Sequence, residues 1–373
     1  MKHALRLTAC AVALTLVSAA QDRVDLDTIY KIKQEAIQNS QVMDHMFYLT
    51  EVYGQRLAGS PNYKKAAEWT VQKLQEMGLK NAHLEKWGPF GRAWQNERFA
   101  AHMLEPSYVP LIGFPLAWSK STDGAVIGEA VIAVIKTEED MAKFKGQLKG
   151  KIVLSEAPRE IQLLDKPFSS RYTDKDLEEI AAAPDPNVRM FGGPRAGGPG
   201  NFMQQMALRK KIAAFWAEEA PAVLLQSGYR NDGGTIAASA AGNRDPSMPL
   251  APATVALTPE HYNRIYRLVD KKVPVKLELE VRNQIGDTND DSFNVVADLP
   301  GTGKHKDEIV MIGGHLDSWN GGTGATDNAA GSAVMMEVIR VLTKLKLPLD
   351  RTVRIALWSG EEQGLLGSRA YVK

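Results

Sequence analysis

The chain has 373 residues, of which 44% are hydrophobic and 24% are charged, and this composition excludes disordered, collagen-like and disulfide-rich proteins. Its 45 basic and 44 acidic residues leave a formal charge of +1, so no overall positive field would hold nucleic acid or an acidic membrane surface. The length predicts two or three domains.

The amino terminus has the pattern of a secretory signal peptide. Lys2 and Arg6 are basic, residues 9–17 are apolar and a run of small residues ends at Ala20, which predicts cleavage after Ala20. The apolar run is too short for a membrane span. Cleavage also removes Cys10, the single cysteine, which suits an oxidising compartment. We therefore expect a secreted or periplasmic protein with no membrane span.

The first two thirds of the chain predict helices followed by short strands. Residues 22–80 have helical periodicity, and two or three helices fit there. Short β-like runs such as 130–135 and 151–155 then predict a mostly β insert. Residues 185–201 are rich in glycine and proline and predict a surface loop, after which a helix is expected over 202–219.

After about residue 285 the pattern changes to alternating strands and helices. Residues 292–299, 308–312 and 352–358 are predicted strands, and the second of them is too apolar for an exposed edge. Residues 327–346 carry apolar side chains on one helical face. A strand, a helix and a strand in this order predict a βαβ unit with a parallel sheet.

Chemically active side chains follow both strands of this unit. His315 and Asp317 follow the first strand, Asp327 lies where the helix opens, and Glu361 and Glu362 follow the second strand. The carboxyl ends of parallel strands meet at one edge of a sheet, so we expect these groups to approach within a few ångströms. One imidazole and several carboxylates without a thiolate suit Zn²⁺ better than Mn²⁺ or Co²⁺.

The spacing of these residues suggests separate roles. Asp317 is placed to accept the ring N–H of His315 that does not face the metal. Adjacent residues in extended backbone point to opposite sides, so one of Glu361 and Glu362 can bind metal while the other serves as general base. Asp327 lies where a helix N-cap is also expected. Each residue alone is more often structural, and the hypothesis rests on their convergence.

Three segments, 314–319, 324–331 and 357–364, resemble those of the co-catalytic two-zinc exopeptidases, in the aminopeptidase family that includes plasma glutamate carboxypeptidase. A weaker resemblance covers 54–62, and the middle of the chain is similar to a protease-associated insert. The resemblance implies an α/β zinc-peptidase sandwich, a mixed and largely parallel sheet flanked by helices, with an inserted β-rich protease-associated domain.

The same resemblance implies a role for each residue of the site. His315 binds one zinc, Glu362 binds the other, and Asp327 bridges them, while Glu361 is the base and Asp317 orients His315. The expected function is a zinc-dependent aminopeptidase acting on peptide substrates, with two zinc ions and no nucleic acid partner. A carboxypeptidase or dipeptidase, and a metal-free binding or receptor-like relative, remain alternatives, and the oligomeric state is not predicted.

The family pattern requires a further acid and a second histidine after Glu362, but no histidine follows His315 in this sequence. We therefore expect a C-terminally truncated form of a longer enzyme, inactive or nearly so. The expected organisation is a signal peptide over 1–20, the helical part of a peptidase domain over 21–110, a protease-associated-like insert over 111–285 and the first βαβ part of the catalytic domain over 286–373.

Overall fold

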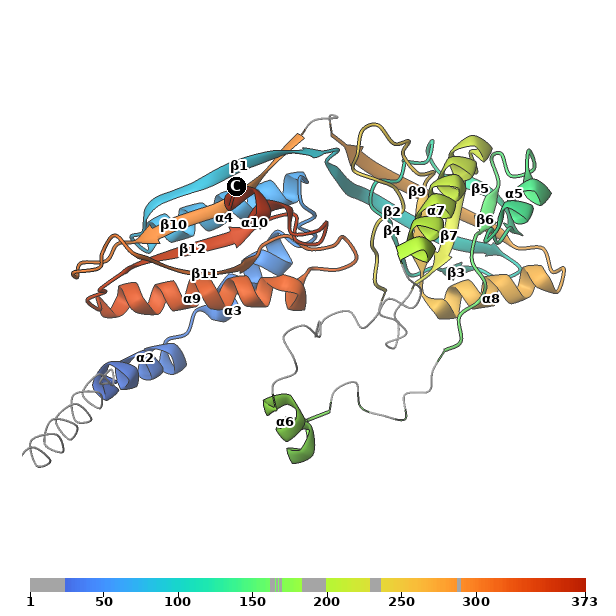
Figure 1. The fold of residues 1–373 in the computed structure, drawn as a ribbon. Helices are drawn as coiled ribbons and strands as arrows, with labels where there is room; N and C mark the ends of the chain where they lie inside the picture. The colour runs from blue at the N-terminus through green and yellow to red at the C-terminus, as the bar shows by residue number, and fades with distance from the viewer. Residues whose placement is uncertain are drawn as a thin grey trace, which may run out of the picture.

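The computed structural model describes residues 24–161, 165, 167, 170–182, 199–228, 236–286 and 290–373. The expected signal peptide and most of the glycine- and proline-rich loop lie outside the described residues. Two sheets lie side by side, each with its own helices, and the chain passes from one sheet to the other between β1 and β2 and again between β9 and β10 (Figure 1).

Helices occupy the start of the described chain, as the periodicity predicted. They are α2 (Leu26–Gln38), α3 (Val42–Phe47), the π-helical turn η2 (Tyr48–Val52) and α4 (Pro61–Glu76). The Ser60 hydroxyl accepts a hydrogen bond from the Tyr63 N–H at 3.1 Å and caps α4, which begins with proline. A capping serine followed by proline at the first position is a favourable helix start.

The first sheet has the strand order β1-β10-β12-β11. Its strands are β1 (Lys80–Gly91), β10 (Asp290–Leu299), β11 (Ile309–His315) and β12 (Thr352–Trp358). Only the β11–β12 pair is parallel, whereas β1–β10 and β10–β12 are antiparallel. The described part of the sheet is therefore mixed, and the expectation of a largely parallel sheet does not hold for it, because β1 and β10 run as one long antiparallel ribbon.

The expected strand–helix–strand unit is present between β11 and β12. The chain passes from β11 through the π-helical turn η3 (Ala325–Ala329) and α9 (Ala330–Leu345) before it enters β12. Helices α4 and α9 share one hydrophobic core with the sheet, and α10 (Leu366–Tyr371) contacts β1 and β10. The crossover fixes the carboxyl ends of β11 and β12 beside each other.

Strand β11 is an edge of this sheet as described. Its residues Ile309, Val310 and Met311 are 48%, 46% and 43% exposed. The expectation that this strand is too apolar for an exposed edge is therefore wrong for the described residues, because β12 lies between β11 and the rest of the sheet.

The second sheet has eight strands in the order β3-β2-β9-β5-β6-β7-β8-β4. They are β2 (Trp94–Glu105), β3 (Val109–Pro110), β4 (Gly113–Pro115), β5 (Val126–Ile132), β6 (Ile152–Leu154), β7 (Val223–Ser227), β8 (Thr254–Leu257) and β9 (Lys276–Ile285). The helices of this part are α5 (Glu138–Phe144), α6 (Asp174–Ala181), α7 (Pro199–Glu219) and α8 (Pro259–Asp270). Strands β5, β6, β7 and β8 are parallel neighbours. The middle of the chain is therefore mixed α/β rather than mostly β, since parallel strands need long crossovers.

The change from one sheet to the other falls between Gly91 and Trp94, and again between Ile285 and Asp290. The expected boundary between 110 and 111 does not coincide with it, because β2 pairs with β9 along its length and belongs to the second sheet. Among the described helices, none has both the length and the hydropathy needed to cross a bilayer.

Candidate metal centre

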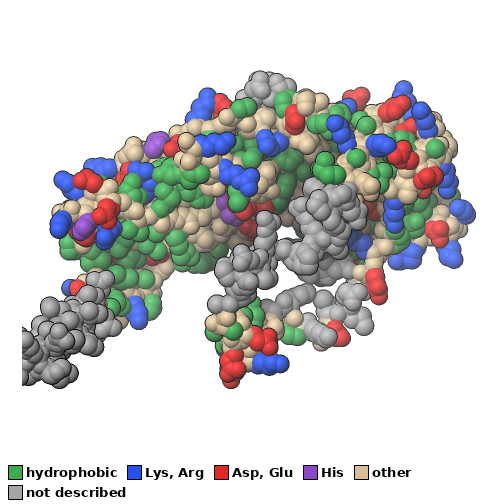
Figure 2. Space-filling model, viewed as in Figure 1, with side chains coloured by type: hydrophobic (Ala, Val, Ile, Leu, Met, Phe, Trp, Pro, Cys, Tyr) green, Lys and Arg blue, Asp and Glu red, His purple; other side chains and the backbone are tan. Residues whose placement is uncertain are grey.

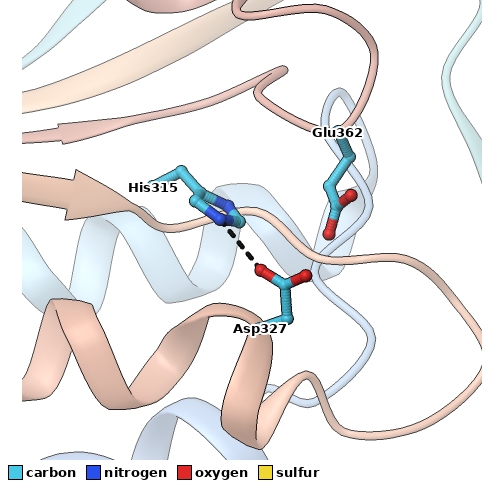
Figure 3. A group of neighbouring side chains, drawn as sticks. All are labelled: His315, Asp327 and Glu362. Carbon is cyan, nitrogen blue, oxygen red and sulfur yellow. Dashed lines mark ion pairs between the residues drawn. The ribbon is translucent and has the colours of Figure 1, made fainter. Parts of the chain in front are cut away.

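Three side chains from separate segments converge at the carboxyl edge of the first sheet. His315 is the last residue of β11, Asp327 lies in η3, and Glu362 follows β12. Each offers one ligand atom, and these atoms all lie within 4.8 Å of one another (Figure 3). The parallel register pairs His315 with Trp358, so the strand that carries the histidine ends beside the strand that leads to Glu362.

The imidazole of His315 is held by both ring nitrogens. Its Nε2 lies 3.0 Å from Asp327 Oδ1 and 3.8 Å from Glu361 Oε2. Its Nδ1 lies 3.1 Å from the main-chain oxygen of Asp317 and 3.5 Å from the Oδ1 of that residue. The main-chain oxygen is thus nearer to the ring than the carboxylate expected from the sequence. A ring anchored through Nδ1 presents Nε2 to the site.

Asp317 connects the end of β11 with the segment that follows β12. Its side chain is fully buried, and its Oδ1 accepts a hydrogen bond from the Glu361 N–H at 3.3 Å. Its Oδ2 has no hydrogen-bond partner among the described residues. A buried carboxylate in this position adds negative charge next to His315 and fixes the backbone of the glutamate pair.

The two glutamates do not lie in extended backbone. The N–H groups of Gly364 and Leu365 both bond to the Glu361 carbonyl, so the segment after β12 is a turn. The alternation expected for a strand therefore does not apply, and both carboxylates face the same site. Glu361 Oε2 lies 3.8 Å from His315 Nε2, while Glu362 belongs to the three-residue group.

Asp327 does not cap the helix that follows it. Its backbone is not helical, with φ of −122° and ψ of 91°, and its peptide bond to Asn328 is cis. The Asn328 side chain accepts a hydrogen bond from the Gly331 N–H at 3.0 Å. The N-cap role expected for Asp327 is not observed, since the N-cap of α9 is Ala329, and the Asp327 carboxylate faces His315.

The concentration of negative charge changes the protonation of the site. Burial, together with the charges of Asp327 and Asp317, raises the pKa of Glu362 to about 7. Burial lowers the pKa of His315, but the hydrogen bond and charge of Asp317 and the nearby carboxylates outweigh it and raise the pKa to about 9. Carboxylates gathered beside an imidazole favour a bound cation. The donor set of one imidazole nitrogen and carboxylate oxygens fits zinc.

One residue of this region was missed by the sequence reasoning. The buried Arg56 binds main-chain carbonyls of the loop between His315 and Asp327. Its segment, 54–62, showed only a weak resemblance, and a single arginine far away in sequence carries no ligand-type pattern. The part of the molecule built on the first sheet is called the first lobe, and the part built on the second sheet the second lobe. Figure 2 shows acidic and histidine side chains together where the two lobes meet.

Comparisons with known proteins agree with this geometry. Residues 294–373 match Peptidase family M28. Carboxypeptidase Q of Mus musculus is 28% identical over 329 residues, which cover 87% of this chain and 59% of that protein. The Homo sapiens protein of the same name is 26% identical over 88% of this chain and 60% of its own length.

Solved structures give the same picture. A Peptidase M28 precursor from Shewanella amazonensis is 26% identical, covers 93% of this chain and 70% of its own, and superposes with a TM-score of 0.59. The zinc aminopeptidase BSAP from Bacillus subtilis is 17% identical over 89% of this chain and 63% of its own, with a TM-score of 0.51, and shares the fold.

These comparisons confirm the resemblance to the co-catalytic zinc peptidases, and they indicate zinc as the cofactor. The mixed α/β fold is that of M28 peptidase structures. The chain spans about 60% of the length of the curated relatives it matches.

Proposed function

We propose, on the premise of the match to Peptidase family M28, that this chain carries active-site residues of a zinc exopeptidase that removes terminal residues from peptides. The convergence of His315, Asp327 and Glu362 from three segments supports the proposal most directly. No single local motif would produce it, and two of the three positions depend on the parallel pairing of β11 with β12.

The three ligands divide between two ions in this proposal. His315 would hold one zinc, Glu362 would hold the other and Asp327 would serve both. Zinc at such a site, when bound, lowers the pKa of a water molecule and polarises the carbonyl of the bond to be cut.

Glu361 transfers the proton, and Asp317 positions the groups around it. Glu361, 37% exposed and 3.8 Å from His315 Nε2, takes a proton from the attacking water and delivers it to the leaving amine. Asp317 keeps the His315 ring oriented, and its Oδ1 also holds the Glu361 N–H, so one buried carboxylate sets the position of both a ligand and the base.

We favour an aminopeptidase because segments 314–319, 324–331 and 357–364 resemble those of the co-catalytic two-zinc aminopeptidases. The carboxylates of Asp317, Asp327, Glu361 and Glu362 lie around a single imidazole. Two bound zinc ions would offset their charge, so the charge of the site alone does not choose between a free amino terminus and a free carboxyl terminus.

A carboxypeptidase or dipeptidase is the second candidate, since the relatives that cover most of the chain carry the name Carboxypeptidase Q. Aminoacyl anilides and N-blocked peptides separate the two. An aminopeptidase cleaves the anilides and leaves the blocked peptides intact, whereas cleavage of N-blocked peptides with release of the last residue would establish a carboxypeptidase.

A binding or receptor-like relative without metal is the remaining alternative. The chain's full set of His315, Asp327, Glu361 and Glu362 supports the enzyme instead. Metal analysis of the purified protein after equilibration with zinc decides between the two, because a metal-free relative retains none.

We further propose that the protein is secreted or periplasmic, with cleavage after Ala20. Amino-terminal sequencing of the exported protein tests the cleavage site.

The 373-residue polypeptide by itself should hold fewer than two zinc ions. Three ligands among the described residues are too few for two four-coordinate ions. We expect one bound zinc and little or no peptide hydrolysis by this polypeptide. Metal analysis and an anilide assay measure both, and substantial metal-dependent turnover would contradict the expectation.

A further inference from the structure

Arg56 is a fully buried arginine whose side chain is bound by main-chain oxygens. Its exposed fraction is 0%, and it is among the largest side chains that are completely enclosed. Nε donates to the Leu316 carbonyl at 2.7 Å, Nη1 to those of Leu49 and Thr323 at 2.5 and 2.8 Å, and Nη2 to that of Gly324 at 2.9 Å.

Three of these four acceptors belong to the loop that separates two ligand residues. Leu316 directly follows His315, and Thr323 and Gly324 directly precede the turn that carries Asp327. One guanidinium group therefore holds both ends of the loop. The backbone of Arg56 continues the same connection, because its N–H donates to Ser318 Oγ at 3.1 Å and its carbonyl accepts from the Ser318 N–H at 3.0 Å.

The packing around this guanidinium leaves no spare room. Gly324 has a φ of +63°, and a Cβ built on it would lie 2.4 Å from Ser318 Cβ and 3.0 Å from Arg56 Nη2. A glycine is required there both for the backbone conformation and for the close approach. The loop therefore packs closely against the Arg56 side chain.

A buried cation without a carboxylate contact is costly, and its retention here indicates a specific use. Among the described residues, Arg56 makes no ion pair within 4.0 Å, and its acceptors are neutral carbonyls. Burial lowers the pKa of Arg56 to about 10, and the charge of Asp317 opposes that shift. The guanidinium and the Asp317 carboxylate therefore stabilise each other in the interior below the site.

We propose that Arg56 is the positioning residue that fixes the spacing of His315 and Asp327, by binding both ends of the loop between them. The inference rests on the proposed zinc peptidase, because the spacing matters only if the two residues bind the same metal site. Lysine cannot replace the arginine, since its single ammonium lacks the planar fork that reaches several carbonyls at once.

The test compares Arg56→Lys with Arg92→Lys in the full 373-residue chain. Arg92 is a matched control, because its guanidinium also binds main-chain carbonyls, those of Met248 and Pro246 at 2.8 Å each, but in the second lobe. Zinc affinity is measured by competition with a chromophoric chelator. We expect Arg56→Lys to weaken zinc binding about 10- to 100-fold, the loss typical of removing a group that orients a metal ligand, and Arg92→Lys to leave it unchanged.

A spectroscopic measurement separates positioning from simple loss of stability. Cobalt(II) added in place of zinc gives a visible absorption spectrum that depends on the geometry of its ligands. The spectrum of Arg56→Lys should shift relative to the unmodified chain, and that of Arg92→Lys should not. If Arg56 only stabilised the fold, Arg56→Lys would lower the thermal midpoint and leave the cobalt spectrum as it was.

Each outcome decides the inference. If Arg56→Lys does not fold, Ser318→Ala replaces it, because that variant removes the acceptor of the Arg56 N–H, together with the donor to the Trp319 carbonyl, and leaves the guanidinium contacts intact. It should weaken zinc binding in the same direction to a smaller extent. Unchanged zinc affinity and an unchanged cobalt spectrum in the folded variant would overturn the inference while the proposed function stood. An unmodified chain that binds no zinc would refute the proposed function itself.

Discussion

Glu361 and Glu362 are neighbours in sequence and face one site, yet their surroundings assign them different roles. Glu362 belongs to the three-residue group, and burial and neighbouring carboxylates raise its pKa to about 7. The Glu361 N–H is fixed by Asp317, and its carboxylate remains partly exposed, where substrate and water can reach it. The residue types and their order in the sequence predicted such a division, but the turn that brings both carboxylates to one side was not predictable from alternation.

Substituting the two glutamates separately tests that division. In the proposed enzyme, Glu361→Gln should lower kcat by about 10²- to 10⁴-fold, the usual contribution of a general base, and should retain zinc. Glu362→Gln should lose zinc, because an amide is a poorer ligand than a carboxylate. Metal analysis and steady-state kinetics of both variants provide the measurement, and zinc loss in Glu361→Gln with retention in Glu362→Gln would reverse the assignment.

A second ionisable group lies buried away from the metal centre. His45 is 4% exposed, its Nε2 lies 3.8 Å from Glu337 Oε2, and it has no hydrogen-bond partner at Nε2 among the described residues. Burial lowers its pKa, Glu337 and Asp44 oppose the shift, and Arg340 and Lys73 add to it. The folded chain therefore favours the neutral imidazole.

The pH dependence of unfolding follows from that direction. Because the folded pKa of His45 lies below its unfolded value, the unfolded chain binds the proton more readily at low pH. The stabilisation is complete above about pH 6.5 and is lost as the pH falls from there through the folded pKa. Urea unfolding at several pH values should show this loss, with His45→Gln reducing the slope by up to about 1.4 kcal/mol per pH unit. An equal slope in both proteins would contradict it.

At the scale of elements, the loop after β11 lies between the two lobes. The Asn320 amide donates to the Pro115 carbonyl at 2.7 Å, and the Trp319 and Trp118 rings meet edge to face with centroids 6.1 Å apart. A Cβ on Gly321 would lie 2.5 Å from the Ala238 nitrogen. The second lobe therefore covers the outer side of the loop that Arg56 holds from within.

Gly321→Ala should separate the loop from the second lobe. The added methyl group meets backbone that cannot move aside as a flexible side chain would, so we expect a loss of about 1–3 kcal/mol in the free energy of unfolding and weaker zinc binding. Gly128→Ala on β5 is the control, because its Cβ would lie 3.5 Å from Ile152 Cδ1 in ordinary contact. Equal unfolding midpoints for the two variants in urea would show that the contact between the lobes carries no energy.

The sequence predicted elements well where periodicity or composition was clear. Strand β12 lies at 352–358 as expected, and the predicted helix 327–346 corresponds to η3 and α9. The parallel run in the second sheet was not predicted, because short buried strands such as β6 have the same composition in parallel and antiparallel sheets. The Arg56 contacts with the loop between His315 and Asp327 join residues 260 or more positions apart and leave no local pattern.

At the scale of the whole molecule, the edge strand β11 of the first sheet exposes apolar side chains. The α9 residues Val334 and Val338 are also 46% and 37% exposed, and Figure 2 shows hydrophobic side chains on the surface of the first lobe. An edge strand with open backbone groups and apolar side chains pairs readily with another chain. Whole-sheet pairing depends on contacts distant in sequence, and the edge position of β11 was therefore not predicted.

The 373-residue polypeptide should consequently self-associate through β11. Val310→Lys places a charge on the edge and should shift the polypeptide toward the monomer in sedimentation velocity. Ile37→Lys on α2 is the control, because Ile37 is 78% exposed but does not lie on a strand edge. Equal association of the two variants would show that β11 is not the contact.

The ribbon that runs between the sheets has one further consequence. Gly91 pairs with Asp290 across β1 and β10, so both points at which the chain leaves the first sheet face each other at the distance of one backbone pairing, about 5 Å. A tight reverse turn can therefore replace everything from 92 to 289 without rethreading β1, β10, β12 or β11. The second lobe can therefore be exchanged as one piece without changing the strand order of the first sheet, but a replacement must offer equivalent contacts to Asn320 and Gly321 if the loop between His315 and Asp327 is to stay in place.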